Sequence, residues 1–142
     1  MSQTESLADI ALLSGRVLVV DDDTLVRTAI ENAITRWGCT VVLAANREEA
    51  LHRCRESARA PDVTVCGMQL PNGVSGIEVG KELQREFESM RILLMSADHS
   101  DECKIAASQA GFGLLKIPVR PASLRAALQL LLADSLPTGG IP

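Results

Sequence analysis

The sequence has few histidines, no paired cysteines and no excess of basic residues, and each shortage argues against a class of function. It contains only two histidines. The four cysteines, which form no Cys-x-x-Cys pair, are Cys39, Cys54, Cys66 and Cys103. A structural zinc site is therefore not expected. Reduced thiols buried as small apolar groups are the better interpretation, and they fit a cytoplasmic protein.

Charge and hydropathy limit the partners of the protein. The 14 basic residues are outnumbered by 18 acidic residues, for a net charge of -4, so a nucleic-acid-binding surface is not expected. No apolar run reaches membrane-spanning length, and the first residues carry Glu5 and Asp9 but no Lys or Arg, unlike a secretory signal. The 142 residues suit one domain. We expect a cytoplasmic protein with neither a nucleic-acid nor a membrane partner.

Three consecutive carboxylates follow a short apolar run. Asp21, Asp22 and Asp23 come directly after Val-Leu-Val-Val at residues 17–20. Such a run predicts a strand buried on both faces, whose carboxyl end is where open α/β sheets bind ligands. Neighbouring carboxylates repel one another, and a hard cation such as magnesium, which prefers oxygen ligands, relieves that repulsion. We predict a magnesium site at Asp21 and Asp22; the alternative is a solvated acidic loop that only caps the next helix.

The hydrophobic pattern alternates between strand and helix periods along the chain. The predicted strands span residues 16–20, 40–45, 63–66, 91–95 and 112–117, and the predicted helices span 24–37, 46–58, 75–87, 100–111 and 121–133. This alternation predicts an α/β fold, a flavodoxin-like doubly wound sheet of five parallel strands in the order 2-1-3-4-5 with five helices. Residues 1–15 would be a lead-in segment, 16–133 the domain and 134–142 a flexible tail.

Capping residues mark the helix starts. Asn46 with Glu49 and Ser75 with Glu78 have the spacing of N-cap pairs. Ser100 precedes two acidic residues, which suit a helix N-terminus. Residues 67–74 contain Pro-Asn-Gly and are predicted to form a loop with a turn.

The ordered motifs resemble the receiver domain of two-component response regulators over about residues 16–133. The matching pieces are Asp21-Asp22, Pro61-Asp62, Leu70-Pro71 followed by Gly76, Met95-Ser96-Ala97, and Pro118. The stretch 114–122 looks like receivers attached to hybrid histidine kinases. In that family an aspartate after the third strand accepts a phosphoryl group from a histidine kinase, and an acidic pair binds magnesium. A Ser or Thr after the fourth strand and a Lys before a Pro contact the phosphoryl group.

Two departures from the family pattern affect the expected site. The phosphoacceptor position holds Gly67, which has no nucleophile and can offer a metal only its backbone carbonyl. Magnesium binding is therefore expected to be weak. The residue directly before Pro118 is Ile117, and Lys116 stands one place earlier. Because adjacent strand residues face opposite ways, Lys116 should point away from the site. With Ser96, Ala97 and Pro118, these two residues are the remnants of a phosphoryl site.

These observations leave three alternative functions. The first is a pseudo-receiver, a signalling module that works by protein-protein contact with a histidine kinase or another signalling protein and is not an enzyme. The second is an ordinary phosphoaccepting receiver in which Gly67 is an engineered or accidental change. The third is a haloacid-dehalogenase-like phosphatase. The motif of that family is Asp-x-Asp-x-Thr, whereas this chain has Asp21-x-Asp23-x-Leu25. The sequence does not decide whether the chain is complete or a piece of a hybrid kinase.

The last helix is apolar on two sides. Three leucines at helical spacing are predicted to face the sheet: Leu124, Leu128 and Leu131. Three apolar residues lie on the opposite side: Ala126, Leu130 and Ala133. A helix apolar on both sides is usually covered on both. We therefore expect a homodimer or partner interface on the fourth helix, fifth strand and fifth helix; the alternative is that Leu130 is a lone exposed leucine.

Overall fold

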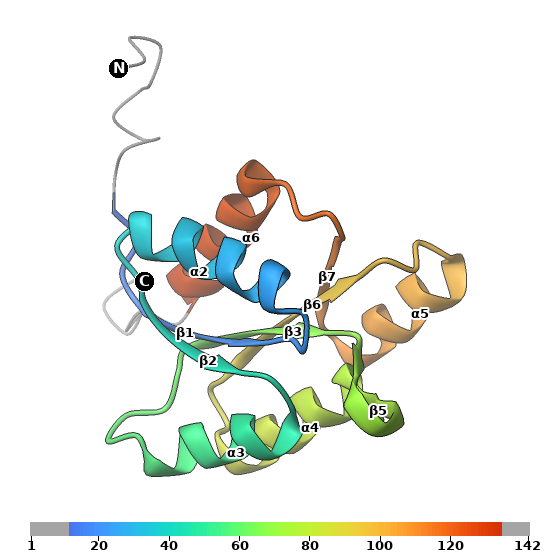
Figure 1. Cartoon of the computed structure of the whole chain (residues 1–142), viewed down its shortest axis with the longest axis horizontal. Coiled ribbons are helices and arrows are strands. Elements are labelled where there is room, and N and C mark those ends of the chain that lie inside the picture. The colour runs from blue at the N-terminus through green and yellow to red at the C-terminus, as the bar shows by residue number, and fades with distance from the viewer. Residues whose placement is uncertain (1–11, 135–142) are drawn as a thin grey trace, which may run out of the picture.

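The computed structural model describes residues 12–134. Its main feature is a sheet of five parallel strands in the order β2-β1-β3-β6-β7 (Figure 1). The strands are β1 (Arg16–Val20), β2 (Thr40–Ala44), β3 (Val63–Gly67), β6 (Arg91–Ser96) and β7 (Gly113–Lys116). Counted along the chain, these strands follow the predicted order 2-1-3-4-5, which confirms the predicted fold class. Most of the predicted lead-in segment and nearly all of the predicted tail lie outside the described residues.

Five helices cover both faces of this sheet, as predicted. They are α2 (Thr24–Arg36), α3 (Arg47–Glu56), α4 (Gly76–Glu86), α5 (Asp101–Ala110) and α6 (Pro121–Asp134). Helices α2 and α6 lie on one face, and α3, α4 and α5 lie on the other (Figure 1). Among residues 12–134, no helix has both the length and the apolar composition needed to cross a bilayer.

Alternation along β1 divides the core into two layers. Val17 and Val19 are fully buried against the side chains of α2 and α6. Leu18 and Val20 are fully buried on the opposite face, against α3 and α4. Successive strand residues point to opposite faces, so an unbroken apolar run is what a strand covered on both sides requires.

The side chains predicted to cap helices do so. The hydroxyl or carbonyl oxygen of each cap accepts a hydrogen bond from a backbone N–H in the first turn of its helix. The pairs are Asn46 with Glu49 at 2.9 Å, Ser75 with Ile77 at 3.1 Å and Ser100 with Cys103 at 3.2 Å. Asp23 caps α2 in the same way, accepting from Leu25 at 2.9 Å and Val26 at 3.3 Å. These hydrogen bonds set the starts of four helices.

The segment after β3 differs from the predicted loop. Two short antiparallel strands, β4 (Gln69–Leu70) and β5 (Val74–Ser75), are joined by a 3-10 turn at Pro71–Gly73. Asn72 adopts a left-handed conformation with φ of 65° inside that turn, which the short polar side chain of asparagine tolerates. Strands of two residues are too short to show an alternating pattern, so only the turn could be predicted from the sequence.

Helix α6 buries a slightly different stripe from the one predicted. Leu124 and Leu128 are buried as expected, but the third buried leucine is Leu132, whereas Leu131 is only half-buried. A spacing of four residues carries the stripe toward Gly15, next to which the Leu132 side chain lies. On the other side, Ala126, Leu130 and Ala133 are exposed, and 72% of Leu130 is accessible.

The first turn of α4 packs directly on the end of β3. A Cβ atom added to Gly76 would overlap the carbonyl oxygen of Gly67. The Gly76 N–H also donates a 2.7 Å hydrogen bond to the carbonyl oxygen of Met68. Glycine at position 76 therefore allows a backbone-to-backbone approach that any side chain would prevent.

We expect Gly76→Ala to lower the free energy of unfolding by about 1–3 kcal/mol, because a methyl group forced into a packed contact shifts the backbone. Urea unfolding followed by circular dichroism is the measurement. The control is Lys81→Ala, an exposed substitution in the same helix, which should change stability by less than about 0.5 kcal/mol. Equal effects of the two substitutions would contradict this account of Gly76.

Candidate functional site

The carboxyl ends of β1, β3 and β6 surround an acidic cavity of about 250 Å³. The β1–α2 connection contributes Asp21, Asp22 and Asp23, and the end of β3 contributes Gly67 and the two residues after it. Ser96, Ala97, Asp98 and Ile117 complete the wall. The sheet topology therefore brings together most of the predicted site residues at the point where the strand order reverses.

Asp21 is the buried member of the acidic cluster, with 6% of its surface exposed. Its Oδ1 accepts a 2.8 Å hydrogen bond from the Asp23 N–H. Burial, followed by the negative charges of Asp22 and Asp23, raises the pKa of Asp21 above its ordinary value, although the hydrogen bond from Asp23 works against this. The carboxylate of Asp21 is thus held in an environment that disfavours its charge and would favour a bound cation.

The two neighbouring acids have different roles. Asp22 is exposed and lines the cavity. Asp23 uses its Oδ1 to cap α2, so the alternative expectation of a capping loop applies to this one residue. Arg27, one turn into α2, donates from Nη1 to the backbone carbonyl of Asp21, and its charge lowers the pKa of the Asp21 carboxyl.

Gly67 lines the acidic cavity at the end of β3. A Cβ atom at this position would lie 3.2 Å from Asp21 Oδ2 and 3.5 Å from the carbonyl oxygen of Gln69. A side chain on residue 67 would therefore project toward the acids. The carbonyl of Gly67 faces the first turn of α4 instead, next to the position of a Cβ on Gly76. That Gly67 offers its carbonyl to a metal stays a prediction, and the Gln69 carbonyl oxygen, 3.5 Å from the position of a Cβ on Gly67, is a second backbone candidate.

Ser96 is buried at the end of β6, and its hydroxyl is already used. Ser96 Oγ accepts a 3.0 Å hydrogen bond from the Asp98 N–H, and Cys103 Sγ lies 3.6 Å away. These contacts hold the turn that follows the strand. Ala97 is exposed beside it and lines the same cavity.

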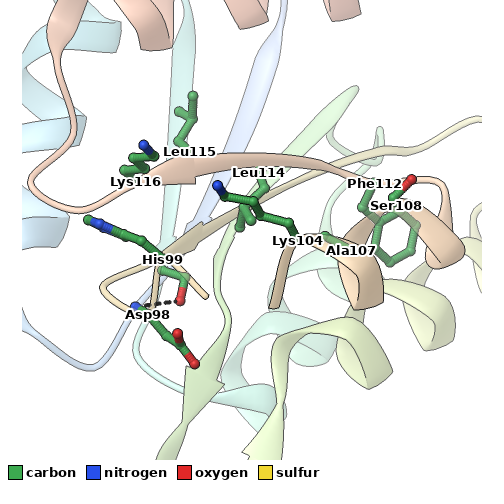
Figure 2. Close-up of a pocket in the computed structure, with 10 residues that line it drawn as sticks. Asp98, His99, Lys104, Ala107, Ser108, Phe112, Leu114, Leu115 and Lys116 are labelled. Carbon is green, nitrogen blue, oxygen red and sulfur yellow. Dashed lines mark hydrogen bonds between the residues drawn. The ribbon is translucent and has the colours of Figure 1, made fainter. Parts of the chain in front are cut away.

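The residues around Pro118, at the end of β7, line different cavities. Ile117 lines the acidic cavity, and its N–H donates a 2.9 Å hydrogen bond to the Ser96 carbonyl. Lys116 does not line that cavity; it lines a neighbouring one between α5 and β7, shown in Figure 2. The peptide bond between Ile117 and Pro118 is cis, and Pro118 lines an apolar groove beside α2. At the end of β7 the acidic cavity is therefore lined by the apolar Ile117 and not by Lys116.

A hard cation has two side-chain ligands and one backbone ligand available here. Asp21, Asp22 and a backbone carbonyl would hold it, and magnesium commonly keeps several waters where protein oxygens are few. No group of three or more His, Cys, Asp or Glu side chains within residues 12–134 is arranged around a common metal position. The donor set thus fits magnesium, with fewer ligands than a dedicated cage would supply.

The chain is similar to response regulators in sequence. Residues 17–129 match the family model of the response regulator receiver domain. Transcriptional regulatory protein AfsQ1 of Streptomyces coelicolor is 34% identical over 95 residues, which are 67% of this chain and 40% of that protein. Response regulator MprA of Mycolicibacterium vanbaalenii is 31% identical over 126 residues, which are 88% of this chain and 53% of that protein. The chain therefore spans about half, or less, of the length of these relatives.

Solved structures give the same result for the fold. The receiver domain of the Francisella response regulator 1452 superposes with a TM-score of 0.76 at 25% identity, covering 86% of this chain and 99% of that one. Chemotaxis response regulator CheY4 of Vibrio cholerae superposes with a TM-score of 0.73 at 26% identity, covering 84% and 99%.

We expect Asp21→Asn to raise the free energy of unfolding at pH 7 in metal-free buffer. The folded state raises the pKa of Asp21, so the charged carboxylate is less stable there than in the unfolded chain. The gain should disappear as the pH falls below the ordinary value of 3.8, where wild-type Asp21 is protonated in both states. Thermal unfolding at several pH values, with a chelator present, is the measurement.

The matched control is Asp22→Asn, which removes the same charge from an exposed position and should stabilise less. An Asp21→Asn variant that is no more stable than wild type at pH 7 would contradict the account of a strained buried carboxylate.

Proposed function

Because the chain belongs to the response regulator receiver domain family, we propose that it works as a receiver-type signalling module without phosphorylation of its own. The observation that carries the proposal is Gly67, which occupies the position from which a side chain would reach toward Asp21. Phosphotransfer needs an aligned nucleophile. Glycine supplies none, and Asp21 and Asp22 would have to act as nucleophile and metal ligand together.

The module then acts through contact with a histidine kinase or another signalling protein of a two-component or phosphorelay system. Ile117 supports this reading independently of Gly67. An apolar side chain at the cavity wall provides no cation to pair with a phosphoryl group, and Lys116 lines another cavity. In this proposal Asp21 and Asp22 still bind magnesium, but weakly.

We also propose that the chain has no phosphatase activity. A haloacid-dehalogenase-like reaction would use the first acid of the cluster as a nucleophile and the acid two places later for proton transfer. Here the Asp23 carboxylate accepts two hydrogen bonds from the first turn of α2. These hydrogen bonds commit the Asp23 carboxylate to capping the helix, so it is not available for proton transfer.

Incubation with acetyl phosphate and magnesium should leave the intact mass of the protein unchanged, because position 67 has no carboxylate to attack. Gly67→Asp should permit slow phosphorylation, since the atoms nearest to the new Cβ atom are Asp21 Oδ2 at 3.2 Å, the Gln69 carbonyl oxygen at 3.5 Å and Asp21 Cγ at 3.7 Å. Adding Ile117→Lys should raise the phosphorylated fraction further by pairing a cation with the phosphoryl group.

Gly67→Asn is the matched control, because it has the shape of the aspartate but lacks the nucleophile, and it should gain no mass. A stable gain of one phosphoryl group on the wild-type protein would overturn the proposal and favour an ordinary phosphoaccepting receiver.

We propose that α5, β7 and α6 form the working surface of the module, where a second copy or a signalling partner docks. Leu130 on α6 is 72% exposed and Ile105 on α5 is 54% exposed. Ala126 and Ala133 extend the apolar side of α6. An amphipathic helix needs only one apolar stripe to pack on the sheet. A second apolar stripe on the outer side of α6 therefore favours the view that another protein covers that side.

Leu130→Glu should abolish self-association, because it places a charge at the centre of that outer side. Sedimentation velocity over a range of protein concentrations is the measurement, with circular dichroism to check the fold. The control is Leu25→Glu, since Leu25 is 81% exposed and belongs to α2, which is not one of the three elements of the proposed working surface. A wild type that stays monomeric at high concentration and binds no receiver-like partner would remove this proposal.

A further inference from the structure

A second cavity, of about 280 Å³, lies between α5 and β7 on the other side of Ser96 from the acidic cluster (Figure 2). Its inner wall is apolar and is formed by Ala107, Phe112 and Leu114. Phe112 and Ala107 are buried, and Leu114 is half-buried. A concave, mainly apolar wall with a few polar groups at the rim is the usual form of a small-molecule site.

The rim of this cavity carries two lysines and a histidine. Lys104 comes from α5 and Lys116 from the end of β7, and His99 comes from the connection before α5. In Figure 2 the side chains of these three residues extend over the same part of the cavity. Both lysines are exposed.

Asp98 is the one acid that lines this cavity, and it is oriented elsewhere. Its Oδ1 accepts a 2.9 Å hydrogen bond from the Ser100 N–H. Figure 2 shows the carboxylate of Asp98 turned away from Lys104 and Lys116. The two lysines that line the cavity therefore have no acid of the same cavity turned toward them.

A third hollow continues the positive rim along the edge of the sheet. It shares Leu114, Leu115 and Lys116 with the second cavity and adds Arg120. β7 is the last strand of the sheet, and Lys116 at its end lines both hollows, one together with Lys104 and the other together with Arg120.

We propose that the cavity between α5 and β7 binds a small organic anion, with a phosphate or carboxylate group between Lys104 and Lys116 and an apolar body against Phe112 and Leu114. The volume lies just below the usual range for ligand sites, so the body is small, about the size of one aromatic ring. Charge-assisted hydrogen bonds from the two ammonium groups select the anion. The site needs neither the missing phosphoacceptor nor magnesium, so it extends the proposed function.

Phenyl phosphate is the probe, titrated into the full chain in chelator-containing buffer and followed by amide NMR. We expect saturable shifts at Lys104, Phe112 and Lys116, with a dissociation constant of about 1 mM for so small a ligand. Benzoate carries a carboxylate on the same body and should shift the same signals. Inorganic phosphate and phenol each supply half of the ligand and should bind more weakly.

Lys116→Gln and Lys104→Gln should each weaken phenyl phosphate about tenfold, because each removes one charged partner of the anion. Lys81→Gln is the matched control, since Lys81 is an exposed lysine of α4 outside the cavity lining, and it should bind as wild type does. All three positions are exposed, so the variants should fold.

Four results would overturn the proposal. The first is the absence of saturation at about 20 mM phenyl phosphate, which would leave the cationic rim to the acidic side chains of a protein partner. The second is binding that is the same in Lys116→Gln, Lys104→Gln and wild type. The third is phenol or inorganic phosphate binding as tightly as phenyl phosphate. The fourth is a set of shifts confined to Asp21–Asp23.

Discussion

The contact between the end of β3 and the first turn of α4 determines what residue 67 can contribute. Because Gly76 has no side chain, the Gly67 carbonyl packs against α4 and its Cα–Cβ direction points to Asp21. Any side chain at position 67 would thus enter the acidic cavity. The backbone at position 67 would therefore direct a longer side chain toward the acids, although glycine itself carries none.

The second constraint is that neighbouring residues of β7 point to opposite faces of the sheet. Ser96 pairs with Lys116 in the β6–β7 register, and Ile117 follows at the wall of the acidic cavity. A displacement of one residue exchanges the faces that two neighbours occupy. Ile117 therefore lines the acidic cavity, whereas Lys116 lines the cavity that Lys104 also lines.

Much of the fold could be predicted because strong local signals agreed with one another. The apolar run of β1 and the caps at Asn46, Ser75 and Ser100 each set an element in place. The β4–β5 hairpin is too short to show a period. In α6 a spacing of three or four residues satisfies the same helical pattern, so the choice of Leu132 over Leu131 depends on packing beside Gly15.

The site was only partly predictable, because sequence patterns describe side chains, whereas backbone oxygens and cavities arise from the packed fold. The sequence does not show where the Gln69 carbonyl points. It also does not show that Lys104 of α5 and Lys116 of β7 line the same cavity. Ser96 lines both resulting cavities. Asp98 also lines both, but Asp21 and Asp22 line only the first and Lys104 and Lys116 only the second. An anion is therefore repelled by the first pair and attracted by the second. This difference in charge makes the cavity of the two lysines the one suited to binding an anion without any covalent step.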